Sequence, residues 1–468
     1  MQKIINYAVN DLIKLIDKNQ NNKDIAYQFI LEEFETGQYS LKFIQHRIKT
    51  SGISKIKYNG AKEKNKYYRN EIDFLQNYLD IGMEQLSKQI DIEIAIITRI
   101  SIVLNIMAHY KIGRYTSKVN KQKRKEIDLF KIAIPETKLH PHFKAIIHES
   151  KKPIRKVLSR WAKGFIDRDK KFNKEFQKTF NSSFWELYLF QCFKELNYIV
   201  DFTKSSPDFT IYTSYDTLCI EATIANEAEN DAPEWSKEAF EQRKEKSHDE
   251  FINYTSVRIL NAIDSKYKKY LNNYSKLEHV QNNPFIIAIA PFDQKLTFNQ
   301  NNIAINNVLF GQMVRHNLLE KNEKAKCEII YNETILKNEN IELDIGIFKT
   351  DRYKEVSAII FSTMATMSKA ITQSDLRCKV RLSKFSEEKG LVIDIIENED
   401  CNESHLEGLQ IYHNPFALNP LDEREFSKYE ITHYWYDKDL NMVGTNQNNN
   451  TIISRNVYEY QYQYQYQV

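Results

Sequence analysis

SSFWELYLFQCFKELNYIVDFTKSSPDFTIYTSYDTLCIEATI, residues 182–224, is the stretch that decides the fold. Its pattern predicts an amphipathic helix over 182–196, followed by three short strands over 198–203, 209–213 and 218–224. A long charged helical region comes next, and the apolar run FIIAIA at 285–290 then suits a strand buried on both faces of a parallel sheet. The predicted order of helix, three strands, helix and strand indicates a mixed α/β (α+β) fold.

Three acids stand out in this stretch: Glu186 on the helix, Asp208 before the second strand, and Glu221 inside the apolar third strand. A hairpin centred between Ser214 and Tyr215 would place Asp208 directly opposite Glu221, on one face of the sheet. Like charges in that position destabilise a sheet unless they share a proton or hold a cation. Oxygen ligands of this kind suit a divalent metal, so the pair predicts a metal site.

Each acid also has a structural explanation. Ser183 and Glu186 have the spacing of a capping box, which would give Glu186 a role at the start of the helix. Asp208 follows Pro207 and could serve a turn. Glu221 could pair with a nearby lysine. The combination of Asp208 and Glu221 is harder to explain in this way, because a buried acid in a strand is costly without a partner.

The segment resembles the core of the PD-(D/E)xK nuclease superfamily, which has the restriction-endonuclease-like fold with an αβββαβ core. Pro207 and Asp208 match the PD element, Glu221-Ala222-Thr223 matches (D/E)-x-K, and Glu186 matches an acid that the first helix often supplies. The resemblance covers roughly residues 180–290, and the motif itself is short and degenerate. The longer region KGFIDRDKKFNKEFQKTFNSSFWELYLF, residues 163–190, also resembles what precedes this core in a group of uncharacterised bacterial proteins.

The motif lysine is missing, because Thr223 stands at its position. In this superfamily the lysine can move to a neighbouring element, and Lys266, on the helix before FIIAIA, is the best substitute. Arg258 lies two turns earlier and could reach the same side. Lys266, Lys268 and Lys269 could equally form a solvated basic face.

The resemblance implies a metal-dependent endonuclease that hydrolyses phosphodiester bonds of nucleic acid. DNA is the favoured substrate, and RNA remains the alternative. Mg²⁺ or Mn²⁺ would be bound by Asp208, Glu221, the Ala222 carbonyl and Glu186, and would activate a water. Lys266 would position the nucleophile or stabilise the phosphorane. An analogy from the fold favours a role in restriction or antiviral defence.

Basic residues gather just ahead of the acidic segment. Residues 111–180 contain 21 Lys and Arg against 7 Asp and Glu, although the whole chain carries a net charge of only +3. This excludes a generally polycationic protein but suits a local contact with a polyanion; a solvated helix surface is the alternative. The residues expected to contact phosphates are Lys151, Lys152, Arg155, Arg168, Lys170, Lys171 and Arg258.

The chain is long enough for two or three domains. We expect a helical N-terminal domain over 1–112, basic linker and helices over 113–180, a nuclease domain over 181–440 with its core at 181–292, and a low-complexity tail over 441–468. The N-terminal domain is a candidate contact for a second copy or a partner protein.

The five scattered cysteines form no C-x-x-C pair, which favours a reducing compartment. We find no signal peptide and no membrane span, so a cytoplasmic location is expected.

Two other functional classes remain open at this stage. One is a catalytically inactive protein that binds nucleic acid or acts as a scaffold and retains a relict nuclease core; Thr223 is its best support. The other is an interaction module whose helical N-terminal half recruits partners. A live metal site would stabilise the fold when Mg²⁺ or Mn²⁺ binds, whereas a relict site would not.

Overall fold

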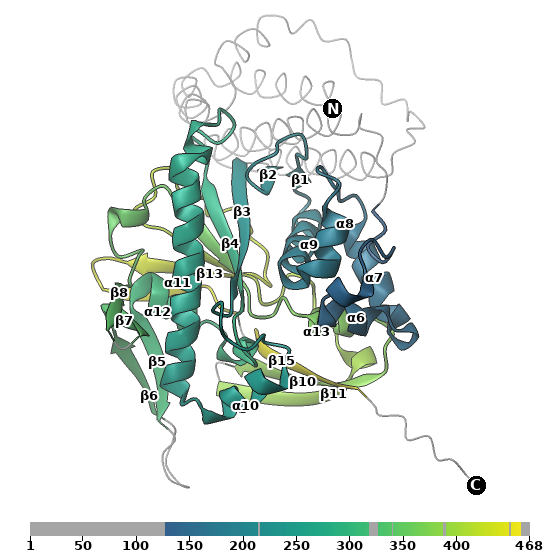
Figure 1. Cartoon of the computed structure of the whole chain (residues 1–468). Coiled ribbons are helices and arrows are strands. Elements are labelled where there is room, and N and C mark those ends of the chain that lie inside the picture. The colour runs from purple at the N-terminus through teal and green to yellow at the C-terminus, as the bar shows by residue number, and fades with distance from the viewer. Residues whose placement is uncertain are drawn as a thin grey trace, which may run out of the picture. The chain divides into compact units, whose positions relative to one another are not determined.

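The computed structural model describes residues 127–213, 216–317, 326–338, 340–386, 390–448 and 451–459. The chain divides into two compact units, Met1–Lys121 and Gln122–Val468, and every described residue belongs to the second. The helical domain expected over 1–112 therefore lies outside the described residues. Within the second unit, helices and strands combine into a mixed α+β architecture (Figure 1).

An eight-stranded mixed sheet lies at the centre of this unit. Its strands, in their order across the sheet, are β1 (Ile199–Val200), β2 (Phe209–Tyr212), β3 (Thr217–Asn226), β4 (Phe285–Phe292), β9 (Ala358–Phe361), β12 (Gln410–His413), β13 (Thr432–Asp437) and β14 (Met442–Thr445). Strands β3, β4 and β9 are parallel neighbours, as are β12 and β13, and the other neighbours are antiparallel. The apolar run at 285–290 is thus a buried strand with parallel neighbours, as its composition predicts.

Two helices cover opposite faces of this sheet beside β3 and β4 (Figure 1). Helix α9 (Phe180–Glu195) packs on the face formed by Ile220 and Ala222, whereas α11 (His248–Asn272) packs on the face that contains Cys219. Side chains alternate between the two faces along a strand. Glu221 therefore points toward α11, and its side chain is fully buried.

The predicted element order is found, with changes at the boundaries. Helix α9 starts two residues earlier than expected, and the first strand has only two residues. The hairpin register is as predicted, because Phe209 lies opposite Ile220 and Tyr212 lies opposite Thr217. The long charged region is divided into α10 (Lys237–Glu245) and α11.

Three short helices precede α9 and belong to the same hydrophobic core. They are α6 (Pro141–Ile147), α7 (Lys152–Ala162) and α8 (Phe172–Lys178). Phe143, Trp161 and Phe176 are buried with the apolar residues of α9. The described part of the region expected as basic linker and helices, residues 127–180, contains these helices, and most of its aromatic residues are buried while most of its lysines are exposed.

Smaller elements surround the main sheet. They are the sheet of β10 (Cys378–Ser386), β11 (Gly390–Glu397) and β15 (Ile452–Glu459), the pairs β5 (Gln312–Asn317) with β6 (Lys326–Tyr331) and β7 (Thr334–Asn338) with β8 (Ile341–Asp344), and helices α12 (Ile303–Phe310) and α13 (Met367–Thr372). No helix among the described residues combines the length and the apolar character that crossing a bilayer requires.

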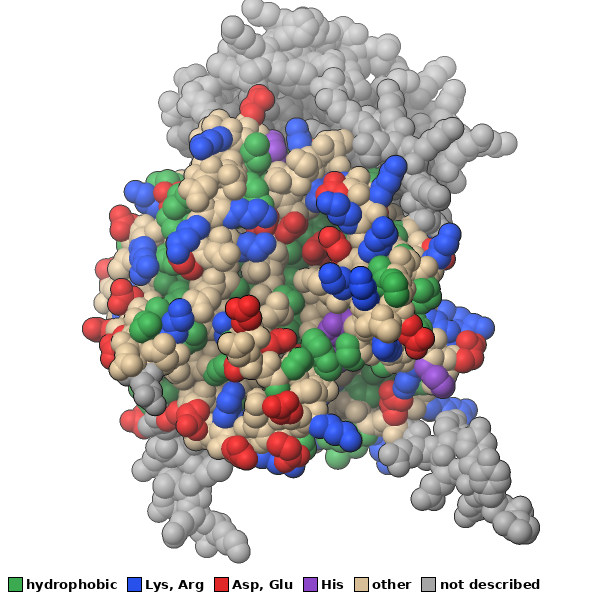
Figure 2. Space-filling view, viewed as in Figure 1, with side chains coloured by type: hydrophobic (Ala, Val, Ile, Leu, Met, Phe, Trp, Pro, Cys, Tyr) green, Lys and Arg blue, Asp and Glu red, His purple; other side chains and the backbone are tan. Residues whose placement is uncertain are grey.

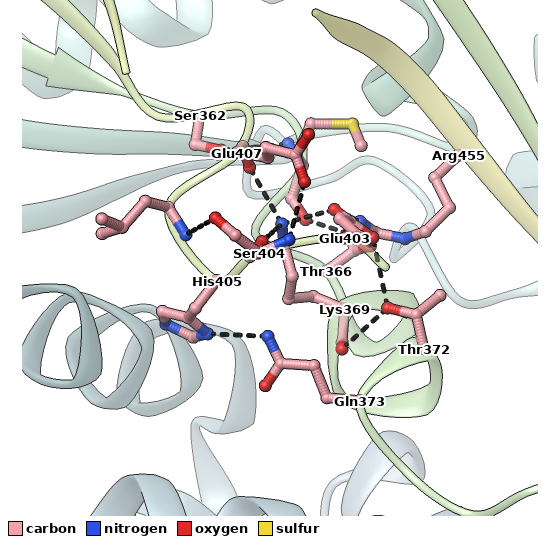
Figure 3. Close-up of polar contacts among 12 residues, drawn as sticks. Ser362, Thr366, Lys369, Thr372, Gln373, Glu403, Ser404, His405, Glu407 and Arg455 are labelled. Carbon is pink, nitrogen blue, oxygen red and sulfur yellow. Dashed lines mark hydrogen bonds and ion pairs between the residues drawn. The ribbon is translucent and has the colours of Figure 1, made fainter. Parts of the chain in front are cut away.

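The expectation of a tail from residue 441 is wrong for β14 and β15, which belong to sheets. A buried ion cluster anchors β15 to the body of the unit (Figure 3). Arg455 of β15 and Lys369 of α13 both pair with Glu403, and Arg455 also donates to the Met364 carbonyl at 2.8 Å. The Tyr–Gln alternation that suggested a tail begins only at Tyr460, after the last residue of β15.

Candidate active site

Asp208 and Glu221 lie opposite each other at the point where β2 begins. Extending the register of Phe209 with Ile220 by one residue pairs Asp208 with Glu221. The Thr213 N–H donates to the Asp216 carbonyl at 3.0 Å, which marks the odd-numbered β2 residues as the hydrogen-bonded partners of β3. Asp208 and Glu221 therefore form a non-hydrogen-bonded pair, the kind in which the two Cα atoms and side chains approach most closely.

The backbone beside this pair has an uneven ladder. Continuing the pattern, residue 207 would be the hydrogen-bonded partner of Ala222, but Pro207 has no N–H to donate. The Ala222 N–H donates instead to Asp208 Oδ2 at 2.8 Å. The Ala222 carbonyl points to the same side as its N–H, so it faces Asp208 and receives no ladder hydrogen bond from residue 207.

Glu221 receives three side-chain donors. Lys266 Nζ lies 2.7 Å and Lys269 Nζ 2.9 Å from Glu221 Oε1, and the Tyr274 hydroxyl donates to Oε2 at 3.0 Å. Burial acts to raise the pKa of Glu221, but the two ammonium groups outweigh it and hold the pKa below its ordinary value. The Glu221 side chain is therefore an ionised carboxylate paired with two lysine ammonium groups.

Helix α11 supplies both lysines, three residues apart on one face of the helix. The structure brings Lys266 to Glu221, although Thr223 occupies the motif position on β3. Lys269 and Tyr274 were not expected at the site. The signal available for Lys269 was its three-residue spacing from Lys266, whereas Tyr274 follows the end of α11 and carries no sequence signature.

Glu186 does not form the capping box suggested by its sequence. Helix α9 begins at Phe180, with Thr179 at the N-cap, so Ser183 and Glu186 lie inside the helix. Burial first, and then the nearby charge of Asp208, raise the pKa of Glu186 to about 8, which Arg168 and Lys266 only partly oppose. Glu186 is thus within electrostatic reach of Asp208 and has no structural role at the helix start.

Asp208 is the third perturbed acid. Burial and the charge of Glu221 raise the pKa of Asp208 to about 6, against the opposing effect of Lys266 and the Ala222 N–H. The three acids therefore differ. Glu221 has two cations beside it, while Asp208 and Glu186 hold their negative charge only at a cost.

Arg168 is the basic residue from the expected phosphate-binding set that lies at this cluster. Its guanidinium donates to the Asp208 carbonyl at 3.1 Å and to the Lys204 carbonyl. Lys170 and Lys171 are exposed and follow it closely along the chain. In Figure 2, Lys and Arg side chains border acidic ones on the face between α11 and α9.

The remaining basic residues are engaged elsewhere. Lys151 pairs with Glu459, Lys152 lies 3.9 Å from Glu149, and Arg155 donates to the Ile146 carbonyl at 2.9 Å.

The structure does not bring Arg258 to the carboxylates. Its guanidinium donates to the carbonyls of Asn226 at 2.5 Å and Glu227 at 3.1 Å. Helix α11 runs antiparallel to β3, so a residue two turns before Lys266 faces the far end of the strand, about 12 Å away along the helix.

The donor set suits a divalent metal with few protein ligands. Within the described ranges, no group of three or more His, Cys, Asp or Glu side chains is arranged to hold a metal ion. Mg²⁺, however, commonly uses one or two carboxylates and keeps several waters. Asp208, Glu221 and the Ala222 carbonyl supply such a set, and a cation there would offset the charge that burial makes costly on Asp208 and Glu186.

Comparison of the chain with protein-family models, with curated proteins and with solved structures finds no match.

Proposed function

We propose that this protein is a Mg²⁺- or Mn²⁺-dependent nuclease that hydrolyses phosphodiester bonds, with DNA as the favoured substrate. One observation carries the proposal: Asp208 lies opposite Glu221, with the Lys266 ammonium 2.7 Å from Glu221. Paired acids with an adjacent amine are the groups that metal-assisted phosphodiester hydrolysis needs. The resemblance to the PD-(D/E)xK superfamily supports the same chemistry, and it supports the proposal that the core has the restriction-endonuclease-like fold.

Asp208, Glu221 and the Ala222 carbonyl would hold the metal, and Glu186, whose charge interacts with that of Asp208, would complete the shell through a water. When bound, the metal would supply an activated water and offset the charge that develops on the phosphorus. Lys266 holds a positive charge beside Glu221, where it can orient the attacking water and stabilise the phosphoryl oxygens. Arg168 donates a hydrogen bond to the Asp208 backbone carbonyl and so helps to hold that acid opposite β3.

Arg168, Lys170 and Lys171 form the basic approach to this site in our proposal. Such contacts hold the phosphate backbone without reading sequence. A role in restriction or antiviral defence is a further proposal, and it rests on analogy with nucleases of the restriction-endonuclease-like fold.

A specific observation favours a second candidate, an inactive nucleic-acid-binding protein. Both oxygens of Glu221 already accept hydrogen bonds, from Lys266, Lys269 and Tyr274. A carboxylate satisfied in this way needs no metal. The two candidates differ in their response to metal, because only a live site gains stability when a divalent cation binds.

Incubation of the full chain with plasmid DNA and with RNA, in the presence of Mg²⁺ or Mn²⁺, tests the proposal. The matched proteins are wild type, Asp208→Asn, Glu221→Gln and the control Lys268→Met, whose lysine pairs with Asp264 and is 67% exposed. Cleavage by wild type and by the control, and its loss in the two site variants, would support the nuclease. Equal cleavage by Asp208→Asn and wild type would rule this site out.

A further inference from the structure

The positive charge at the candidate site is unevenly distributed. Both lysine ammonium groups converge on one atom, Glu221 Oε1, at 2.7 and 2.9 Å. The side chain of Asp208, opposite, accepts only the Ala222 N–H among the described contacts. A divalent cation shared by Asp208 and Glu221 would therefore find Glu221 already paired with two positive charges.

We propose that Lys269 is a displaceable counter-ion, which pairs with Glu221 until a divalent metal takes its place and then turns to the phosphate of the substrate. This inference rests on the metal site of the proposed function and adds a regulatory step to it. Two ammonium groups on one carboxylate oxygen compete with a cation for the same lone pairs. Metal entry is easier when one of them leaves.

Exposure and position indicate that Lys269 is the group that leaves. The Lys269 side chain is 43% exposed, against 23% for Lys266. Lys266 has the larger electrostatic effect on the pKa of Asp208, and it also acts on Glu186. If Lys266 left, Asp208 and Glu186 would each lose a favourable positive charge. If Lys269 left, the main loss would fall on Glu221, whose negative charge the metal would offset.

Tyr274 provides a second contact for the released amine. Lys269 Nζ lies 5.0 Å from the centroid of the Tyr274 ring, within the range of a cation–π interaction. Lys269 is also in the last turn of α11, where a positive charge is favourable next to the helix C-terminus. The amine can therefore leave Glu221 and remain beside the site, facing solvent and an incoming phosphate.

Isothermal titration of the full chain with Mn²⁺ alone tests this mechanism without any nucleic acid. Lys269→Met should bind Mn²⁺ about tenfold more tightly than wild type, because one competing charge is gone. Lys269→Arg keeps the charge and should bind like wild type. Lys268→Met removes the same charge one residue away, from a lysine paired with Asp264, and should leave Mn²⁺ affinity unchanged.

Equal Mn²⁺ affinity of Lys269→Met and Lys268→Met would overturn the inference. Melting temperatures without metal verify that the variants fold, and Lys269→Gln replaces Lys269→Met if the latter does not. Should wild type cleave DNA while Lys269→Met shows no gain in affinity, the inference fails and the nuclease stands. Should Lys269→Met gain affinity while no protein cleaves DNA or RNA, the nuclease fails and the displaceable lysine stands.

Discussion

Lys266 Nζ lies 2.7 Å from Glu221 Oε1, although the two residues are 45 positions apart and belong to a helix and a strand. Because Thr223 stands at the motif position, β3 supplies no lysine there, and α11 supplies Lys266 from the neighbouring helix instead. The contact places an amine beside the acid in an arrangement that the sequence motif alone lacks.

Replacing Lys266 with Met should reduce metal-dependent cleavage by about 100-fold or more, because a positioned charge next to the reacting phosphate is lost. Single-turnover cleavage of a plasmid at saturating Mg²⁺ measures the effect. The Lys268→Met protein, whose lysine pairs with Asp264, is the matched control and should keep wild-type rates. Undiminished cleavage by Lys266→Met would show that Lys266 does not replace the lysine that is missing at position 223.

Mg²⁺ or Mn²⁺ should raise the melting temperature of the wild-type protein, and a chelator should reverse the rise. A ligand that binds only the folded state stabilises it by about 2.7 kcal/mol at 100 times its Kd. Asp208→Asn keeps an acceptor for the Ala222 N–H but removes a charge, so its melting temperature should respond much less. An equal rise in both proteins would place metal binding elsewhere on the chain.

Glu425 should make stability depend on pH. This buried acid accepts from the Tyr198 hydroxyl at 2.6 Å, and burial raises its pKa to about 7. The unfolded chain loses the proton near its ordinary pKa of 4.5, while the folded protein keeps it until about pH 7. The folded state thus holds more protons in this window, and its stability falls as the pH rises.

Urea unfolding at pH 5 and at pH 8 measures this contribution. The loss of stability between the two should be smaller for Glu425→Gln than for wild type by about 2–3 kcal/mol. The same pH dependence in both proteins would mean that Glu425 is ionised in the folded state.

The ion cluster around Glu403 should hold the C-terminal strand in place. Glu403→Gln leaves the buried amine of Lys369 and guanidinium of Arg455 without a counter-charge, which should cost about 3–5 kcal/mol. Asp394→Asn breaks a partly exposed pair with Lys384, 3.0 Å apart, and should cost less than about 1 kcal/mol. Urea unfolding of the two variants compares them directly, and similar costs would contradict a structural role for the cluster.

Much of the fold near the site could be predicted because its signals are local. The two-residue period of the strands and the position of the turn determine the pairing of Asp208 with Glu221, and the structure has this register. The capping box at Ser183 was misleading for the opposite reason. Its spacing is common, and only the packing of Phe180 and its neighbours shows that α9 starts earlier.

Burial in the regions before α9 and after residue 441 was harder to predict from composition. The first region is basic and was expected as linker and helices, and the second is polar and was expected as a low-complexity tail. A few residues in each, such as Trp161 and Arg455, are nevertheless buried. Burial depends on partners that are distant in sequence, and the average composition of a short stretch of sequence cannot detect such partners.

The sequence by itself determined the order of the elements, the hairpin register and the three acids of the candidate site. Only the tertiary structure decided which cations face those acids. Lys266, Lys268 and Lys269 look alike in sequence, yet the first and third contact Glu221 while the second pairs with Asp264. The physical reason is that the rotation of α11 is set by its apolar side chains packing on the sheet, and this long-range packing selects which lysines point inward.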